Sequence, residues 1–312
     1  MASAMYFSKH IGKKIDDTID YVTNPNLLDN WYFVNPVNQR GSTSYPTGGV
    51  YTVDRWKSIY TRTAVELTSL GVKLSTTTSD TGYFQQYLEN PAQYYGRQIT
   101  ISVLIDGTDL ITNTAVIPTS KPTASTKICG LSIRSATACG LYLSASGGLT
   151  AQFAVLSGSS YTITAVKLEL GEQQTLAHQD ASGNWVLNEI PDYGEQLARC
   201  QRHQYVIAYT GTYGFFGTVL TKPDANASRA SVTVPVAMRI APKVTMEGNF
   251  YIQSEGALDT AVTGVAWAAL DASNTVRLAL NHSAKSSLVH AGVGLLTNGS
   301  STTSKLIFDA NL

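Results

Sequence analysis

The sequence predicts an all-β protein, built as two β-sandwiches that follow a short N-terminal helix. Only 14% of its 312 residues are charged, whereas a typical soluble domain carries about 25%. Ser, Thr, Gly, Asn and Tyr fill the difference, a composition typical of all-β structural proteins. Runs of strand length, rich in Ile, Val, Thr and Tyr, alternate with turns that contain Gly or Ser. The length suits two domains and a terminal element.

Residues 1–23 are predicted to form a helical anchor, with the helix itself over residues 8–22. Its apolar stripe consists of Ile11, Ile15, Ile19 and Val22, at spacings of four, four and three residues. A single short helix cannot bury such a stripe by itself in water. The stripe therefore packs either on its own domain or, as a trimerisation element, on copies of itself.

Residues 24–180 are predicted to form the first β-sandwich. The runs "RQITISVLIDG" and "SYTITAVKLEL" have the length and composition of strands, and turn signals such as Asp106-Gly107 separate the strands. Alternating strands and turns of this kind predict two antiparallel sheets packed face to face.

An aromatic-rich stretch opens this region, and Trp31 and Trp56 within it have two interpretations. They either form an exposed binding face or fill the core, as aromatic residues of sandwiches commonly do. We favour the core. On this interpretation "NLLDNWYFVNPVNQRG" forms the first strand and "YTVDRWK" forms the next, with its tryptophan packed inward.

Residues 181–203 are predicted to be a linker that ends in a short helix. The stretch "GEQQTLAHQDASGNWVLNEIPD" is polar and loop-like, and residues 182–184 within it mark a turn. In "DYGEQLARCQRHQY" the oppositely charged Glu195 and Arg199 stand four residues apart, as in a helical i,i+4 pair.

Residues 204–312 are predicted to form the second, smaller β-sandwich, a tip domain. The runs "SVTVPVAMRI", "NTVRLAL" and "SKLIFDANL" have strand length and are joined by turns of Ser, Gly and Asn. Pro235 has no N–H to donate to a central ladder, which predicts an edge position for the first of these runs.

Charge and spacing argue against several classes of protein. A formal net charge of zero disfavours a nucleic-acid partner, because phosphate binding needs a basic surface. The sequence contains no run of about 18 apolar residues, so we expect no membrane helix. The N-terminus lacks the pattern of a signal peptide. Cys129, Cys139 and Cys200 have neither zinc-site nor disulfide-framework spacing, so we expect buried thiols.

The sequence carries no catalytic or metal-binding signature. Its five histidines lack metal-ligand spacing, and the nucleophile-elbow, phosphate-loop and dinucleotide motifs are absent. A glycosidase needs two carboxylates that face each other across the sugar, yet acidic residues are sparse where the aromatic residues gather. We therefore expect no enzymatic activity and no cofactor.

Aromatic residues give the stronger functional signal. The flat C–H faces of sugars stack on aromatic rings, while Asn, Gln and Asp side chains bond the hydroxyl groups. The candidates for glycan binding are Tyr94, Tyr95, Tyr213 and Trp267.

Three sequence blocks within residues 24–180 resemble one family. In chain order they are "NPNLLDNWYFVNPVNQRG…YTVDRWK", "GYFQQYLENPAQYYGRQITISVLI" and "AVKLELGEQQTLAHQD". Together they resemble the carbohydrate-binding-module-like jelly roll of bacteriophage and prophage fibre proteins. The block "YFSKHIGKKIDDTIDYV" is similar to the helical lead-in of such fibres, and "IPDYGEQLARCQRHQY" with "VTVPVAMRIAPKVT" resembles their junction and tip domain.

The resemblance implies a homotrimeric, non-enzymatic virion protein. Its N-terminal segment would dock on another virion protein, and its β domains would bind a bacterial surface glycan, with no membrane insertion. Such a protein is assembled in the bacterial cytoplasm and exposed on the particle surface, as a tail or head fibre. Modules of this kind accommodate a structural calcium ion, for which the sequence assigns no ligands. Two alternatives stay open: a capsid-attached head fibre or decoration protein without a receptor role, and a polysaccharide depolymerase.

Overall fold

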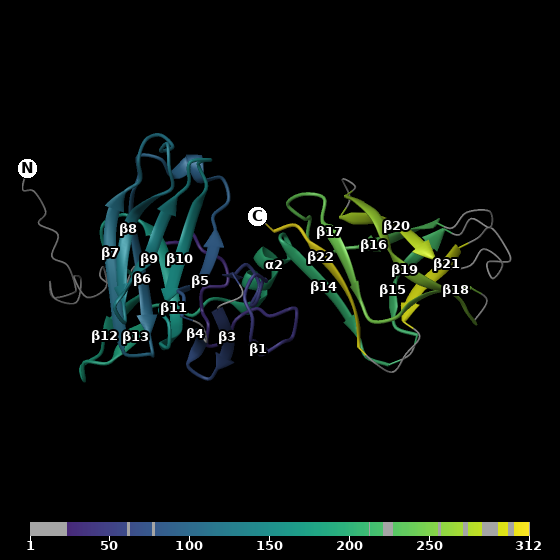
Figure 1. Ribbon diagram of the computed structural model, residues 1–312, viewed down its shortest axis with the longest axis horizontal. Helices are drawn as coiled ribbons and strands as arrows, with labels where there is room; N and C mark the ends of the chain where they lie inside the picture. The colour runs from purple at the N-terminus through teal and green to yellow at the C-terminus, as the bar shows by residue number, and fades with distance from the viewer. Residues whose placement is uncertain are drawn as a thin grey trace, which may run out of the picture. The chain divides into compact units, whose positions relative to one another are not determined.

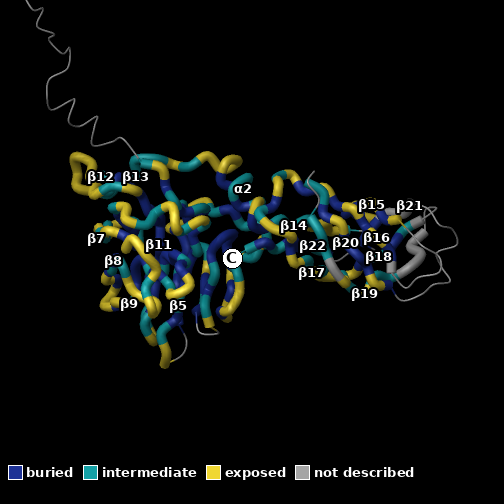
Figure 2. Tube along the Cα trace, turned by 90° about the horizontal axis from the view of Figure 1, so that it is seen from above, coloured by how far each residue is buried: buried dark blue, intermediate teal, exposed yellow. Residues whose placement is uncertain are grey.

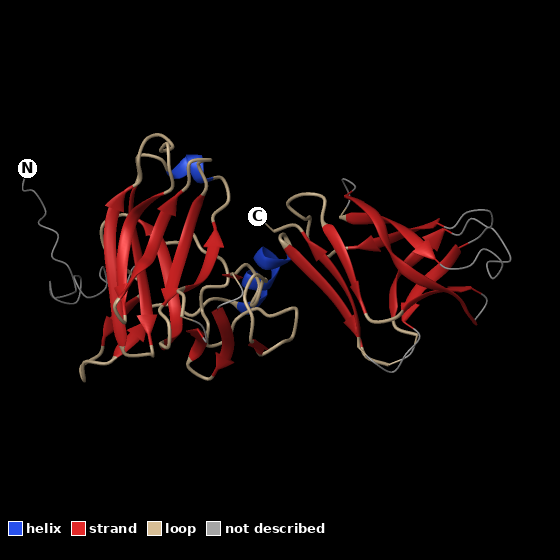
Figure 3. Ribbon diagram, in the orientation of Figure 1, coloured by secondary structure: helices blue, strands red, loops and turns tan. Residues whose placement is uncertain are grey.

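The computed structural model describes residues 24–60, 63–76, 79–211, 213–220, 227–254, 257–270, 274–282, 293–298 and 303–311. These residues divide into two compact units. Unit 1 contains the described residues up to Pro36 together with Ser42–Asp192, and unit 2 contains Val37–Gly41 and the chain from Tyr193 onward. Both units consist mainly of strands, which confirms the predicted all-β class (Figure 3).

Unit 1 is an antiparallel sandwich of two sheets (Figure 1). The six-stranded sheet contains, in spatial order, β1 (Ser44–Tyr45), β3 (Thr63–Thr68), β4 (Gly71–Thr76), β11 (Ser160–Leu170), β6 (Gln98–Ile105) and β7 (Asp109–Val116). The five-stranded sheet contains β2 (Lys57–Ile59), β5 (Gly82–Tyr87), β10 (Leu149–Val155), β9 (Ala136–Leu143) and β8 (Thr126–Ile133). The connections from β5 to β6, from β7 to β8 and from β10 to β11 pass from one sheet to the other, as in Greek-key sandwiches.

The two predicted strands "RQITISVLIDG" and "SYTITAVKLEL" are the paired central strands β6 and β11. Their register places Val166 opposite Val103 and Leu168 opposite Ile101. Both strands are buried along almost their whole length, which explains why their sequences read as nearly continuous β-branched and apolar runs rather than as strict alternation.

Aromatic rings fill the centre of unit 1. The Trp56 ring stacks on Phe84 with centroids 5.0 Å apart, and Phe33 meets it edge-on at 5.2 Å. Trp31 and Trp56 are both buried, which confirms their interpretation as core residues. In Figure 2 the buried residues follow the strands, and the exposed ones gather at the turns and along the outer faces.

The stretch "NLLDNWYFVNPVNQRG" is not the regular first strand that the sequence predicted. It runs irregularly beside β11, where the Leu27 and Phe33 N–H groups donate to β11 carbonyls at 2.8 and 3.0 Å. Between these contacts the chain bends, with Asn30 at a φ of 53°. The Asn26 side chain donates to a β11 carbonyl at 2.8 Å. The Asn26 side-chain oxygen also accepts the Leu28 N–H at 3.0 Å, a local bond that competes with regular strand pairing.

Residues 171–192 are part of unit 1 and do not form the featureless linker that their polarity predicted. They contain a hairpin of β12 (Ala177–Gln179) and β13 (Trp185–Leu187). The Asp180 carboxylate accepts the N–H groups of Ser182 and Asn184 at 2.8 and 2.9 Å and so holds the turn. Strands of three residues are too short for alternation to be visible in the sequence.

The α-helix α2 (Tyr193–Gln201) forms where the sequence predicted a short helix. Glu195 lies in its first turn and Arg199 in its last, the placement that the helix dipole favours. Cys200 and Gln196 are its buried residues. The other predicted helix, over residues 8–22 with its stripe of Ile11, Ile15, Ile19 and Val22, lies outside the described residues.

Unit 2 combines a small sheet with a closed barrel. The small sheet contains, in order, β14 (Gln204–Tyr209), β22 (Ser304–Asp309) and β17 (Lys243–Glu247). The barrel contains β15 (Phe215–Leu220), β16 (Ala227–Thr233), β20 (Thr275–His282), β19 (Ala257–Leu270), β18 (Phe250–Ser254) and β21 (Val293–Asn298). The largest sheet of the tip thus closes on itself instead of forming half of an open sandwich, and closure removes its edges.

Apolar side chains at every second position of the strands fill the core of unit 2. Val276, Leu278 and Leu280 of β20 are fully buried, as the alternation in "NTVRLAL" predicts. The edge position predicted from Pro235 is wrong. β16 ends at Thr233, before the proline, and lies between β15 and β20 inside the barrel.

The segment Val37–Gly41 caps one edge of the small sheet in unit 2. The Gln39 amide donates to the Gln204 carbonyl at 2.7 Å and accepts the Val206 N–H at 3.3 Å, so it acts as a short strand partner for the outer edge of β14. The Lys305 ammonium donates to the Arg40 carbonyl at 2.6 Å and holds the segment from the neighbouring strand.

The three cysteines are free and buried, as predicted. Burial raises the pKa of the Cys129 thiol from 9.0 to about 11. Burial also raises the pKa of Cys139, whose sulfur accepts the Ala154 N–H at 3.1 Å. Both thiols are therefore protonated and unreactive in the folded protein at neutral pH.

Unfolding is expected to become easier above pH 9 because of these thiols. The unfolded chain ionises Cys129 near pH 9, while the folded chain keeps its proton until about pH 11. The stabilising contribution is complete below pH 9, and it falls by roughly 1 kcal/mol between pH 9 and 10. Urea unfolding from pH 7 to 10.5 measures this fall. Cys129→Ala should show a shallower decline, and an identical decline in both proteins would contradict the assignment.

Candidate functional site

The outer face of the five-stranded sheet in unit 1 gathers aromatic, amide and ammonium side chains. Phe84, Leu141 and Phe153 point into the core from β5, β9 and β10, so the residues that alternate with them point away from it. We call this surface the tyrosine face. It consists of Lys57, Tyr83, Gln85, Tyr87, Lys127, Tyr142, Thr150 and Gln152.

Strand register arranges most of these side chains in two rows across the sheet. The first row runs Lys57, Gln85, Gln152, Gly140 and Gly130. The second row runs Tyr87, Thr150, Tyr142 and Lys127. Directly opposed residues have Cβ atoms about 5 Å apart, so the rows are contiguous over five strands. Gln85 and Thr150 are buried within them, the tyrosines and Gln152 are half-buried, and Lys127 is exposed.

Hydrogen bonds within the face hold its amides in place. The Gln85 amide nitrogen donates to the Tyr87 hydroxyl at 2.5 Å, and the Gln152 amide nitrogen donates to the Ala138 carbonyl at 3.1 Å. In these contacts each amide uses its nitrogen, so its carbonyl oxygen remains to accept a bond from a ligand hydroxyl. Side chains fixed in this way lose little conformational entropy when a ligand binds.

The Tyr142 hydroxyl of the face stays protonated at physiological pH, so it can donate a hydrogen bond to a ligand. Burial raises the pKa of Tyr142, and the Cys139 thiol and the Tyr83 hydroxyl raise it further. Tyr83 and Tyr142 belong to β5 and β9, which are separated in the sheet by β10.

No Asp or Glu occurs in the five strands that build the face, β2, β5, β8, β9 and β10. Glycoside hydrolysis requires a pair of carboxyl groups on either side of the scissile bond. Rings, amides and hydroxyls without a carboxylate pair can stack on a sugar and bond its hydroxyl groups. The chemistry of this face therefore suits recognition of a sugar.

Tyr94 and Tyr95, two of the sequence-predicted candidates, lie outside the tyrosine face. Tyr94 ends the short 3-10 helix η1 (Pro91–Tyr94), and Tyr95 follows it. Both are partly buried and pack against the core of unit 1. The Tyr95 hydroxyl donates to the Gly147 carbonyl at 2.9 Å and so supports the turn between β9 and β10.

The other two candidates belong to unit 2. Tyr213 is exposed and has a φ of 63°, and its N–H donates to the Asn298 carbonyl at 3.0 Å. Two more exposed aromatic residues, Tyr209 and Phe215, stand close to it in the chain. Trp267 lies in β19 opposite Ala279, and its side chain is outside the described part of the structure. The four candidates thus divide between the two units.

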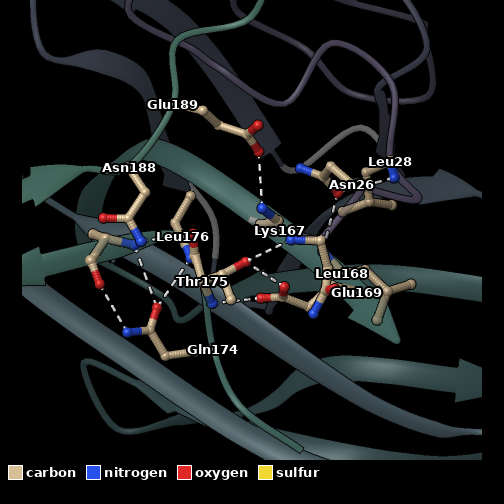
Figure 4. A network of polar contacts seen from close by, with 12 residues as sticks. Asn26, Leu28, Lys167, Leu168, Glu169, Gln174, Thr175, Leu176, Asn188 and Glu189 are labelled. Atoms are coloured by element: carbon tan, nitrogen blue, oxygen red, sulfur yellow. Dashed lines mark hydrogen bonds and ion pairs between the residues drawn. The ribbon is translucent and has the colours of Figure 1, made fainter. Parts of the chain in front are cut away.

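A second polar cluster lies buried on β11 (Figure 4). Lys167 is completely buried, and its ammonium lies 2.8 Å from the Glu189 carboxylate. The carboxylate of Glu169, also completely buried, accepts the N–H of Thr175 at 2.7 Å and its hydroxyl at 2.5 Å. Asn26 accepts the Leu168 N–H from the other side at 3.1 Å.

This cluster holds covering segments onto the sandwich rather than performing chemistry. Glu189 and Thr175 belong to residues 171–192, and Asn26 belongs to the irregular stretch beside β11. Each contact ties one of these segments to the strand. Lys167 and Glu169 are completely buried and are not accessible to a substrate, whereas the Glu189 side chain is 33% exposed.

Within the described residues, no group of three His, Cys, Asp or Glu side chains could hold a metal ion. The same residues include no helix that is both long enough and apolar enough to cross a bilayer. The described residues therefore offer no set of ligands for the structural calcium ion that the resemblance to fibre modules suggested.

Compared with models of protein families, with curated proteins and with solved structures, the chain matches none of them. The resemblance to phage fibre proteins therefore stays a prediction from the sequence blocks. The tyrosine face was not among the sequence-based candidates. One signal for it was present: in "GYFQQY" the residues Tyr83, Gln85 and Tyr87 alternate with core-facing ones.

Proposed function

We propose that this protein is a non-enzymatic structural protein of a bacteriophage particle, a homotrimeric fibre that binds a bacterial surface glycan through the tyrosine face. The observation that carries glycan recognition is the composition of that face. It combines three tyrosines with two glutamines and a threonine, and its five strands hold no carboxylate. Fibre identity and trimeric assembly are supported by the sequence blocks and by the all-β architecture.

Trimeric display would strengthen weak binding. Single glycan contacts on a shallow aromatic surface are expected to be roughly millimolar, and linking three of them multiplies the overall affinity. Because few residues of the chain are charged, hydrogen bonding and ring stacking would supply most of the binding energy for a glycan.

Tyr142→Ala is expected to weaken binding to a bacterial surface polysaccharide roughly tenfold, since aromatic residues dominate the energy of binding surfaces. Affinity electrophoresis against a panel of purified surface polysaccharides, with the full chain, measures the change. Tyr142→Phe keeps the ring and should retain most of the affinity. Thermal unfolding of each variant verifies that the sheet is intact.

Tyr213→Ala is the matched comparison, because this exposed tyrosine lies in unit 2 and was predicted from the sequence. If the tyrosine face is the site, Tyr213→Ala binds like the unmodified chain. Lost binding in Tyr213→Ala together with unchanged binding in Tyr142→Ala would move the site to the tip. Binding to no polysaccharide would favour the decoration protein, which electron microscopy of labelled particles would place on the capsid.

A further inference from the structure

We infer that the glycan recognised by the tyrosine face is anionic, with negatively charged groups on at least two of its sugar units. This inference rests on the proposed function and adds the chemical class of the ligand. It follows from two lysines of the face and from the absence of acidic residues around them.

Lys57 and Lys127 stand at opposite margins of the face. Lys57 belongs to β2 and Lys127 to β8, the two edge strands of the five-stranded sheet. Four strand spacings of about 4.8 Å separate these edges, or roughly 19 Å. The two ammonium groups are thus too far apart to hold one anionic group together, and they suit separate charges along an oligosaccharide.

Neither lysine has a carboxylate partner among the described residues, whereas other cations of unit 1 do. Lys73 pairs with Glu66 at 3.7 Å and Arg134 with Asp106 at 2.8 Å. The Lys57 ammonium instead lies 5.4 Å from the centre of the Tyr51 ring. That cation–π contact orients the lysine without neutralising it.

Lys127 is also held in place with its charge available. Its ammonium donates one hydrogen bond to the Thr137 carbonyl at 2.9 Å, which leaves two of its three N–H donors for a ligand. Its aliphatic stem lies over Gly130 of the first row, where an added Cβ would come 3.2 Å from the Lys127 Cε. The stem therefore crosses the face, and the charge stays at its margin.

The positive charge is local to this surface. The whole chain has a formal net charge of zero, with 22 basic and 22 acidic residues, yet the five strands of the face contain no acid. Uncompensated cations beside low-charge walls attract anions from solution. Two lysines are few for a phosphate backbone, so the combination with tyrosine rings favours an acidic polysaccharide over a nucleic acid.

Binding of the full chain to polygalacturonate and to neutral dextran, each at 50 and 300 mM NaCl, tests the inference. We expect stronger binding to polygalacturonate at low salt and a marked loss at high salt. Lys57→Gln and Lys127→Gln should each weaken that binding about threefold, and together about tenfold. Lys73→Gln, which removes a lysine already paired with Glu66, should change nothing.

The possible outcomes separate this inference from the proposed function. Equal binding of the two polymers, sensitive to Tyr142→Ala but not to the lysine variants, would overturn the anionic ligand and leave glycan recognition standing. Binding of neither polymer, nor of any surface polysaccharide, would overturn both. Displacement of polygalacturonate by an equal charge of duplex DNA would show a general polyanion surface and would also overturn the inference.

Discussion

Glu189→Gln is expected to lower the free energy of unfolding of unit 1 by about 3 kcal/mol. Lys167 is completely buried, and Glu189 is the one carboxylate within ion-pair distance of it among the described residues, at 2.8 Å. The neutral amide would leave a cation in the interior without a counter-charge. Such a loss is much larger than the worth of the pair itself, because desolvation of the remaining charge is no longer offset.

Denaturant unfolding followed by tryptophan fluorescence measures this effect, since Trp31, Trp56 and Trp185 all lie in unit 1. Glu66→Gln is the matched control: it breaks an exposed pair with Lys73 and should cost less than about 1 kcal/mol. Adding Lys167→Met to Glu189→Gln should restore most of the stability, because it removes the buried charge. A double variant as unstable as Glu189→Gln alone would show that the charge is not the cause.

Trp56→Ala is expected to cost about 3–5 kcal/mol, the usual range for deleting a large buried ring. Its ring is fully buried and lies between 5.0 and 6.0 Å from those of Phe84, Phe33 and Phe153. Its indole N–H also donates to the Asn30 carbonyl at 3.0 Å. The substitution therefore opens a cavity in the core and also leaves the Asn30 carbonyl without this hydrogen bond.

The same unfolding experiment compares Trp56→Ala with Trp56→Phe and with Tyr60→Ala. Phenylalanine keeps most of the ring volume and should lose less stability than alanine. Tyr60 is largely exposed, and its removal should cost only a small fraction of the alanine effect. A Trp56→Ala protein as stable as Tyr60→Ala would contradict the central role of this ring in the core.

Those parts of the fold whose signal is local could be predicted from the sequence. β6 and β11 follow from long β-branched runs that end at turn residues, and α2 follows from its charge pair. The inward tryptophans follow from ordinary core composition. In each case the residues that decide the structure lie within about ten positions of one another.

Features that depend on distant partners could not be predicted. The irregular path of "NLLDNWYFVNPVNQRG" depends on β11, more than a hundred residues later, which offers carbonyls to Leu27 and Phe33. Closure of the barrel depends on β21 pairing with both β15 and β18. The residues next to these segments in the sequence do not indicate which distant strand each segment pairs with.

The candidate site shows the same division. The alternation of Tyr83, Gln85 and Tyr87 can be read in the sequence, but the juxtaposition of Gln152 and Tyr142 with them requires the strand order β5-β10-β9. Of the four aromatic candidates chosen from the sequence, only Tyr94 and Tyr95 are neighbours along the chain, and Tyr213 and Trp267 belong to the other unit. The face that the fold assembles instead draws on residues from Lys57 to Gln152, 95 positions apart.

The capping of β14 by Gln39 has a consequence for how such a gene can recombine. A single crossover at the codons for Asp192 and Tyr193 would transfer most of unit 2 without the five residues Val37–Gly41 that belong to it. In the hybrid protein the resident Arg40 would face foreign side chains in place of the Gln204 amide oxygen that it contacts at 2.5 Å and the Asp309 carboxylate at 3.8 Å. These five codons should therefore be inherited with the distal half of the gene, although they lie within the proximal half.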